Sequence, residues 1–132
     1  MKRVEELVPK DKFDFSGIEE LHMLSDEEIE PVLPFLLEWM KDMNWPVAKE
    51  MPKLLSKHQQ LLVPCIIKAL QPEQFECDWK NFIIWDLLLK LDRQYLVMIK
   101  SCLERIIEKP TQGELLEETN IAAKEFLQEN GW

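Results

Sequence analysis

An imperfect internal repeat is the feature that most constrains the fold of this chain. In each copy, an apolar run with an early proline is followed by a tryptophan and a second apolar run. The prolines Pro34 and Pro64 lie 30 positions apart, whereas Trp45 and Trp79 lie 34 apart, so the second copy holds about four extra residues. Paired apolar segments at such a period are typical of stacked helix pairs. The repeat therefore predicts an architecture and indicates little about chemistry.

The composition supports helices in a single unit. Of the 132 residues, 46% are hydrophobic and 31% are charged, as in a globular chain, and only 3 are glycine. Leucine, isoleucine, methionine, glutamate and lysine dominate over β-formers. A chain of this length is expected to bury one core, so residues 1–132 are predicted to form one domain.

Apolar residues recur at helical spacing along most of the chain. Two capping boxes, Ser25 to Glu28 and Thr111 to Glu114, mark helix starts. Proline at Pro34 and Pro52 predicts a kink or bend within the helices that contain it. The pattern predicts three antiparallel helix pairs: 26–41 with 45–57, 59–71 with 79–91, and 93–109 with 112–130.

These pairs predict an all-α fold. The layout resembles HEAT repeats, which implies a right-handed alpha-alpha superhelix over residues 25–130, with the first helices on the convex side and the second helices on the concave side. Residues 1–24 are expected to form an N-terminal arm, held to the body by Phe13 and Phe15.

The net charge of −9 is unevenly placed. Residues 1–30 carry −6 and residues 104–132 carry −4, which leaves the middle of the chain near neutral. The sequence holds no basic run of the kind that binds nucleic acid or anionic lipid, so those partners are disfavoured and a basic protein partner is favoured. It also contains no signal peptide and no apolar stretch long enough to span a membrane. Three cysteines without CxxC spacing argue against disulfides and indicate a cytoplasmic protein.

Four segments of the sequence stand out beyond the repeat: residues 7–14, 25–29, 37–48 and 109–111. Together they resemble a family of short bacterial proteins classed as a domain of unknown function. The resemblance implies an all-helical, HEAT-like fold, and it supplies no activity and no catalytic residues. Pro52 departs from the aliphatic residue expected at that position.

The sequence shows no pattern for a cofactor or a metal ion. His22 and His58 stand in different repeat units, without a second ligand at i+3 or i+4, and are expected at the surface or at a boundary. Cys65 follows His58 by about two helical turns, but its apolar surroundings favour a small core residue over a nucleophile. Phosphate-binding loops and dinucleotide fingerprints are missing from the sequence. We therefore expect no cofactor, no metal site and no catalytic residue.

Five residues form the candidate binding site that the sequence suggests. Asp86 interrupts a strongly apolar segment, where a carboxylate is costly unless it finds a donor or reaches solvent. It either emerges on the concave face, where it meets Lys80 or Lys49, or joins a polar cluster inside a groove. Indole rings give a large contact area at low entropy cost, which suits a binding hot spot. The candidate residues are Trp39, Asp42, Lys80, Trp85 and Asp86.

Other prominent residues fit structural roles. Trp45 and Trp79 occupy equivalent repeat positions and are expected to pack at the junctions, whereas Trp39 and Trp85 are expected to be partly exposed. Asp78 is expected to cap the helix that follows it, and the alternative places it with Asp42 and Asp86 in the polar cluster inside the groove. A functional site should lie where the two copies differ, which includes the extra residues 73–77.

Three functions remain open. The first is a non-enzymatic binding module that engages another protein across its concave face, for example as an antidote to a basic toxin or nuclease. The second is an enzyme of the HEAT-like DNA glycosylase type. The near-neutral middle of the chain argues against it, although Lys49, Lys53, Lys80 and Lys90 could share a face. The third is a structural or oligomerising protein, and the oligomeric state itself is open.

Overall fold

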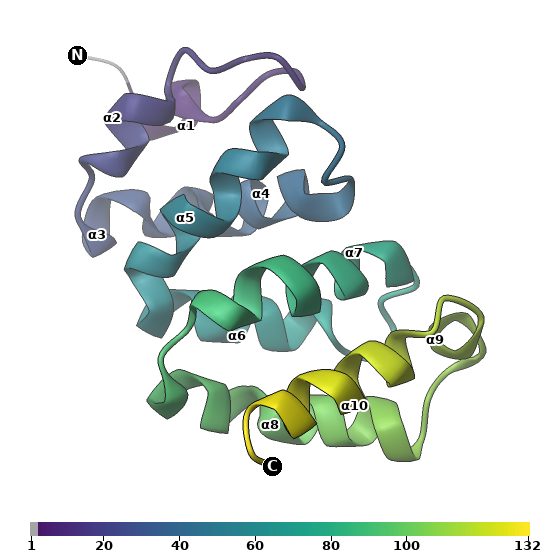
Figure 1. Ribbon diagram of the computed structural model, residues 1–132. Helices are drawn as coiled ribbons and strands as arrows, with labels where there is room; N and C mark the ends of the chain where they lie inside the picture. The colour runs from purple at the N-terminus through teal and green to yellow at the C-terminus, as the bar shows by residue number, and fades with distance from the viewer. Residues whose placement is uncertain (1–2) are drawn as a thin grey trace.

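The computed structural model describes residues 3–132, and the secondary structure within this range is entirely helical. The helices lie in two layers (Figure 1). The rear layer holds three helical segments in contact with one another in chain order. They are residues 26–41, which comprise α3 (Asp26–Ile29), η1 (Glu30–Val32), α4 (Leu33–Glu38) and η2 (Trp39–Lys41), then α6 (Gln59–Ala69), and α8 (Arg93–Glu108).

The front layer also holds three segments, and they contact one another through α5, η5 and α10. They are residues 46–58, which comprise η3 (Pro46–Glu50), α5 (Met51–Leu55) and η4 (Ser56–His58), then residues 77–90, which comprise α7 (Cys77–Phe82), η5 (Ile83–Leu87) and η6 (Leu88–Lys90), and finally α10 (Thr119–Glu129), with the short α9 (Gln112–Leu116) before it.

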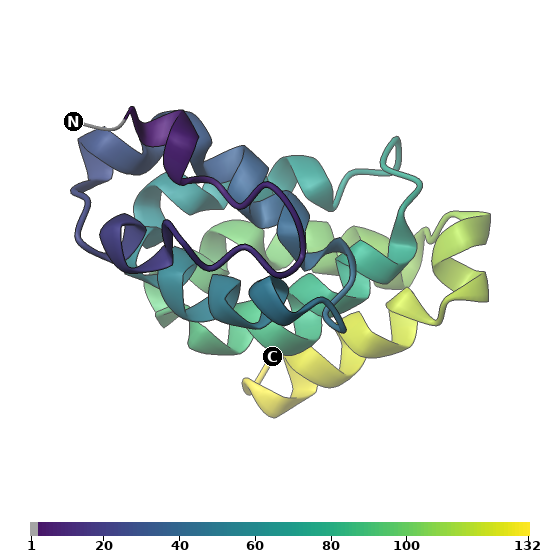
Figure 2. The ribbon, with the colours of Figure 1, turned by 90° about the horizontal axis from the view of Figure 1, so that it is seen from above.

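Each front segment runs opposite to the rear segment that precedes it, and the three front segments run in the same direction (Figure 1). Figure 2, seen from above, shows the two layers edge-on. The prediction of an all-helical fold is confirmed, and the predicted segments agree with the observed ones to within two residues at most of their ends.

Prolines explain why several segments are broken into short pieces. Pro31, Pro34, Pro46 and Pro52 all lie at the first or second position of a helical piece. A proline lacks the amide hydrogen that a helix interior requires, so it is tolerated where an amide would have no helical partner. The segments 26–41 and 46–58 therefore alternate between α and 3-10 geometry, as the predicted kinks imply.

One hydrophobic cluster extends from Leu7 to Leu127 and lies between the layers. Trp79 belongs to it, and its indole Nε1 donates a hydrogen bond of 3.0 Å to the carbonyl of Leu37. Trp45 packs edge-on against Trp39, with 5.6 Å between the ring centroids. The bond from Trp79 joins the first repeat unit to the second, whereas the contact of Trp39 with Trp45 lies within the first unit. Burial of apolar area at such junctions is the main source of stability in stacked helices.

Two predictions about helix ends are wrong. Asp78 does not cap its helix, because α7 begins one residue earlier at Cys77 and Asp78 lies in its first turn. The last helix is not continuous over residues 112–130, because Glu118 adopts a left-handed conformation with φ of 57° between α9 and α10. A side chain disfavours this region of φ, so Glu118 holds local strain.

The N-terminal arm contains two short helices, α1 (Val4–Leu7) and α2 (Ile18–His22). The prediction that Phe13 and Phe15 hold it to the body is wrong, because both rings are exposed and Leu7, Ile18 and Leu21 are buried instead. Gly17 lies so close to the backbone of Leu7 that a Cβ at this position would collide with it.

His58 also differs from the prediction. It is buried, and its Nδ1 lies 2.5 Å from Oδ1 of Asp26. Both predicted capping boxes are present: the hydroxyls of Ser25 and Thr111 accept from the backbone amides of Glu28 and Glu114. Within residues 3–132 no helix is long and apolar enough to cross a membrane. The same part of the chain contains no group of three or more acidic, histidine or cysteine residues arranged to hold a metal ion.

Candidate binding site

The segment 77–90 is the element around which exposed functional side chains gather. It contains a π-helical turn, Ile83–Leu87, and the amide of Leu88 donates to the carbonyl of Ile83. A π-turn inserts one extra residue into a helix and often occurs at functional sites. Trp85 and Asp86 both lie in this turn and line different hollows on two sides of the segment.

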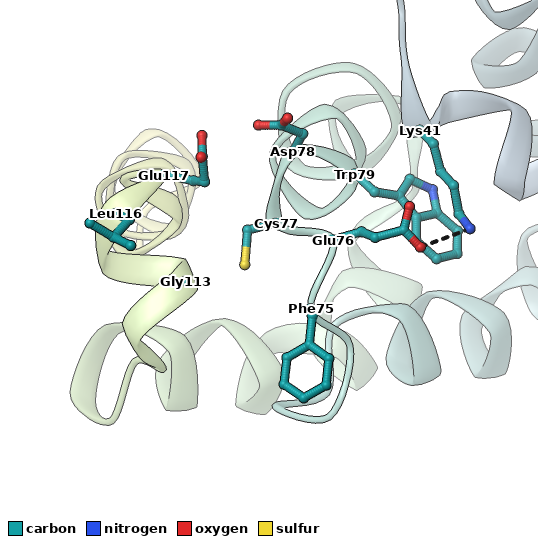
Figure 3. A pocket seen from close by; sticks show the side chains of 9 residues that line it. All are labelled: Lys41, Phe75, Glu76, Cys77, Asp78, Trp79, Gly113, Leu116 and Glu117. Carbon is teal, nitrogen blue, oxygen red and sulfur yellow. Dashed lines mark ion pairs between the residues drawn. The ribbon is translucent and has the colours of Figure 1, made fainter.

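The first hollow lies where 77–90 begins, and we call it the end hollow (Figure 3). Its volume is about 280 Å³, and it lies between the loop before Cys77, the start of α7 and the short α9. Phe75 and Leu116 expose 86% and 73% of their surfaces beside it, which is unusual for such large apolar side chains. It is lined by Lys41, Phe75, Glu76, Cys77, Asp78, Trp79, Gly113, Leu116 and Glu117.

Two carboxyl groups face each other at the rim of the end hollow. Asp78 projects from α7 toward Glu117, which follows α9 (Figure 3). A hydrogen bond shared with the carboxyl of Asp78, together with the negative charge of Asp78, raises the pKa of Glu117. Asn81, one turn after Asp78, donates to the backbone carbonyl of Glu117 at 2.9 Å and so fixes the position of that residue. Among residues 3–132, neither carboxylate of the Asp78–Glu117 pair has a cationic partner.

The other acidic residue of the end hollow is already neutralised. Glu76 pairs with Lys41 at 2.9 Å, and Lys41 also pairs with Glu38 at 3.2 Å. Burial opposes the charge of Lys41, but these two ion pairs outweigh it and raise the pKa of the amine. The Lys41 ammonium also lies 4.8 Å from the centre of the Trp79 ring. Lys41 is therefore already paired with Glu76 and Glu38, and the Asp78–Glu117 pair is the part of the end hollow that lacks a counterion.

Lys80 has a structural role that the sequence did not reveal. Its side chain is fully buried, and its Nζ donates to Glu114 at 2.7 Å and to the carbonyl of Gln71 at 2.9 Å. Arg105 donates to both carboxylate oxygens of Glu114, at 2.5 and 2.9 Å. Burial raises the pKa of Glu114, but the hydrogen bonds from Arg105, Lys80 and the Thr111 amide outweigh this effect and lower it to about 2. Lys80 therefore cannot touch a partner, in contrast to its predicted place in the groove.

The second hollow, which we call the tryptophan groove, lies between 77–90 and α10. It has a volume of about 190 Å³, and Trp85 is half exposed in it. Phe82 supports the indole edge-on, with 6.1 Å between ring centroids. The groove is lined by Ile84, Trp85, Leu89, Ala122, Glu125, Phe126, Glu129 and Asn130.

The third hollow, the lysine hollow, lies on the opposite side of 77–90, against the segment 46–58. It has a volume of about 540 Å³ and contains Asp86, whose pKa is raised by burial. Lys49 lines the same hollow as Asp86, as one prediction for Asp86 expected, whereas Lys80 does not. The hollow is lined by Met43, Lys49, Glu50, Pro52, Lys53, Asp86 and Lys90.

The remaining candidate residues, Trp39 and Asp42, lie at the junction between the first rear and front segments. Both are partly exposed. Trp39 contacts Trp45, and the carboxylate of Asp42 accepts a hydrogen bond of 2.9 Å from the amide of Asn44. Of the five candidate residues, Lys80, Trp85 and Asp86 therefore all lie on 77–90, but Lys80 is buried and Trp85 and Asp86 line different hollows. Trp39 and Asp42 lie on other segments, so the structure does not gather the five residues into one site.

Sequence reasoning missed Glu117, Phe75 and Leu116. Phe75 lies within the extra residues 73–77, the region where the repeat copies differ, so its place in the sequence was a usable signal. Glu117 stands in an acidic segment in which nothing separates one glutamate from its neighbours. Glu117 also stands directly before the break at Glu118, which helical periodicity does not predict.

Together, the fold and the end hollow define an all-helical protein with an acid pair open to solvent. The chain belongs to the family described as Domain of unknown function (DUF5071), which matches residues 7–127. This agrees with the resemblance in the sequence to a domain of unknown function. Comparison with curated proteins finds no match.

Proposed function

We propose that this protein is a non-enzymatic, HEAT-like binding module and that its Asp78–Glu117 pair receives a cationic side chain from another protein. The stacking of like-directed segments in each layer supports a superhelical repeat. The observation that carries the proposal is the acid pair itself, which is held in place by Asn81 and lacks a counterion within residues 3–132.

Electrostatic repulsion explains why this pair suits a cation. Two carboxylates at close range disfavour each other's charged forms, so one of them retains its proton to a higher pH. An arginine or lysine placed between Asp78 and Glu117 removes this repulsion and restores the charge of both groups. The neighbouring acidic residues Glu76 and Glu114, by contrast, already form ion pairs with lysine or arginine side chains of the same chain.

The apolar neighbours indicate what surrounds the cation. Phe75 and Leu116 are exposed beside the acid pair. An arginine has an aliphatic stem that packs on apolar surface while its guanidinium binds a carboxylate in bidentate geometry. The partner is therefore a protein with a basic residue flanked by apolar ones, as a basic toxin or nuclease neutralised in the cytoplasm would be. The contact lies at the end hollow, at one edge of the proposed concave face.

Binding fits the exposure of the acid pair better than catalysis does. A carboxyl dyad that transfers protons works best in a closed site from which water is excluded. Asp78 and Glu117 are both exposed, and no nucleophile is activated beside them, because burial raises the pKa of the Cys77 thiol.

An NMR titration tests this proposal. The probe is acetyl-Leu-Arg-Arg-Leu-amide, and the matched control peptide carries citrulline, a neutral isostere, in place of each arginine. We expect the arginine peptide to shift the backbone amides of residues 75–79 and 113–118. We also expect its affinity to rise as the pH passes upward through the pKa of Glu117, since the ionised pair binds the cation.

Paired variants separate the acid pair from general negative charge. D78N/E117Q should weaken binding by about tenfold, the size expected from losing two surface ion pairs of up to about 1 kcal/mol each. E19Q/E104Q removes the same charge from exposed positions elsewhere and should bind as the wild type does. Equal losses in both variants, or shifts spread over the whole acidic surface, would contradict the proposal.

A further inference from the structure

We propose that a second copy of this chain covers the exposed ridge of 77–90 and forms a two-fold symmetric dimer centred on Trp85 and Leu89. Both side chains are large, apolar and at least half exposed, at 50% and 63%. They lie at the end of the segment away from the acid pair, with Asp78 about two helical turns before Trp85. This proposal therefore uses a different surface from the one proposed for a basic partner.

Charges of opposite sign flank the ridge on its two sides. Lys49 and Lys53 line the lysine hollow next to Asp86 and Lys90, on the side toward 46–58. Glu125 and Glu129 line the tryptophan groove next to Trp85, on the side toward α10. All four of these flanking residues are exposed.

These flanking charges have no partners of their own. Within the part of the chain that the structure describes, none of Lys49, Lys53, Glu125 and Glu129 forms an ion pair. Asp86 and Glu50 also face the lysine hollow and reduce its positive charge, but three lysines, Lys49, Lys53 and Lys90, line it against these two carboxylates. The lysine side of the ridge therefore remains positive in a protein with a net charge of −9.

The order of these features selects one symmetry. In a two-fold dimer, the patch of one copy meets the same patch of the other. An axis that lies in the interface and runs along 77–90 exchanges the two sides of the ridge. Lys49 and Lys53 of each copy then meet Glu125 and Glu129 of the other, while Trp85 and Leu89 meet their own copies. An axis across the segment would place lysines against lysines and is disfavoured.

The resulting interface has the usual composition of a protein contact. Trp85 and Leu89 form an apolar centre from which water is excluded, and the flanking lysines and glutamates form a charged rim. The same lysines could bind nucleic acid instead, but the carboxylates of Asp86 and Glu50 in the hollow and the net negative charge oppose a polyanion. A second copy supplies complementary charge on both sides at once, so we favour the dimer.

Sedimentation equilibrium of the full chain tests the proposal through a charge swap. K49E/K53E and E125K/E129K should each lower the association constant at least tenfold, because each places like charges opposite one another on both sides of the axis. An equimolar mixture of the two variants should recover the wild-type association, since both sides of the mixed dimer again pair opposite charges. K68E/K109E, with reversals at exposed positions in the rear layer and after it, should associate as the wild type does.

L89E provides a second, independent measurement. It brings two glutamates together at the axis and should abolish association, while its circular dichroism and its affinity for the arginine peptide stay unchanged. D78N/E117Q should lose peptide binding and still dimerise. A wild-type chain that stays monomeric at all accessible concentrations would overturn the dimer, whether or not it binds a DNA oligonucleotide. A mixture of the charge-swapped variants that stays monomeric would overturn it as well.

Discussion

Two glutamates at α9, Glu114 in the helix and Glu117 directly after it, each face a residue of α7, and their electrostatic environments are opposite. Lys80 and Glu114 join α7 to α9 inside the protein, and Asp78 and Glu117 face each other at the surface beside them. The pKa of Glu114 is lowered to about 2 by its cationic partners, whereas the pKa of Glu117 is raised by its acidic neighbour. Asp78 and Lys80 lie only two residues apart on α7, yet the carboxylate that faces Lys80 is fully compensated and the one that faces Asp78 is not.

The difference separates structure from function. Glu114 accepts bonds from Lys80, Arg105 and the Thr111 amide, so it caps α9 and anchors it to α7 and α8. A group with this many partners has little capacity for another protein. The Asp78–Glu117 pair can still accept a cation, and the raised pKa of Glu117 reflects the missing counterion.

The largest effect is expected from removing the buried charge. Glu114→Gln keeps the shape of the side chain but leaves the buried Lys80 ammonium without its counterion. Breaking a buried ion pair in this way costs about 3 kcal/mol. Urea unfolding should show this loss for Glu114→Gln and no loss for the matched variant Glu117→Gln, in which repulsion is relieved. Similar losses in both variants would show that the two contacts do not differ as described.

The contributions of Glu114 and Glu117 to the free energy of unfolding should depend on pH in opposite ways. The folded pKa of Glu114, about 2, lies below its ordinary value of 4.5. Its stabilising contribution is therefore fully present above about pH 4.5 and is lost as the pH falls toward about 2. The raised pKa of Glu117 acts in the opposite sense, since its contribution is present below its ordinary value and is lost as the pH rises through its folded pKa.

The measurement is the midpoint of urea unfolding at several pH values in this range. The difference between wild type and Glu114→Gln isolates Glu114 from other carboxylates, including Asp14, whose pKa is also lowered to about 2. We expect this difference to shrink as the pH falls from about 4.5. A difference that stays constant would mean that the pKa of Glu114 is not lowered in the folded protein.

The smallest effect concerns the backbone that positions the acid pair. Glu118 adopts a φ of 57°, which costs a residue with a Cβ about 1 kcal/mol relative to glycine. Glu118→Gly should therefore raise the free energy of unfolding by up to about 1 kcal/mol. Glu118→Ala, which keeps the Cβ, should not raise it. If both variants stabilise the protein equally, the cause is the lost charge and the backbone strain is absent.

Much of the fold could be predicted because its signals are local. Helical periodicity, two capping boxes and the positions of Pro34 and Pro52 lie within a few residues of the structure they produce. The break at Glu118 could not be predicted in this way, because the residues around it read as one helix. Its left-handed backbone is sustained by surrounding contacts, among them the bond from Asn81 to the carbonyl of Glu117.

The candidate site was only partly predictable. Trp85 and the region of residues 73–77 stood out because they break the repeat, and both border hollows in the structure. Lys80 was predicted to lie in the groove, because nothing in the neighbouring sequence indicates whether its side chain is buried or exposed. Its partner Glu114 lies 34 residues away, and no local pattern connects the two.

By itself, the sequence determined that the chain is helical and where most of its helical segments start and end. Only the tertiary structure decided which charges are compensated and which remain open. The physical reason is the range of the interactions. Helix formation depends on residues a few positions apart, whereas the charge state of a carboxylate depends on whichever groups the fold brings within a few ångströms of it.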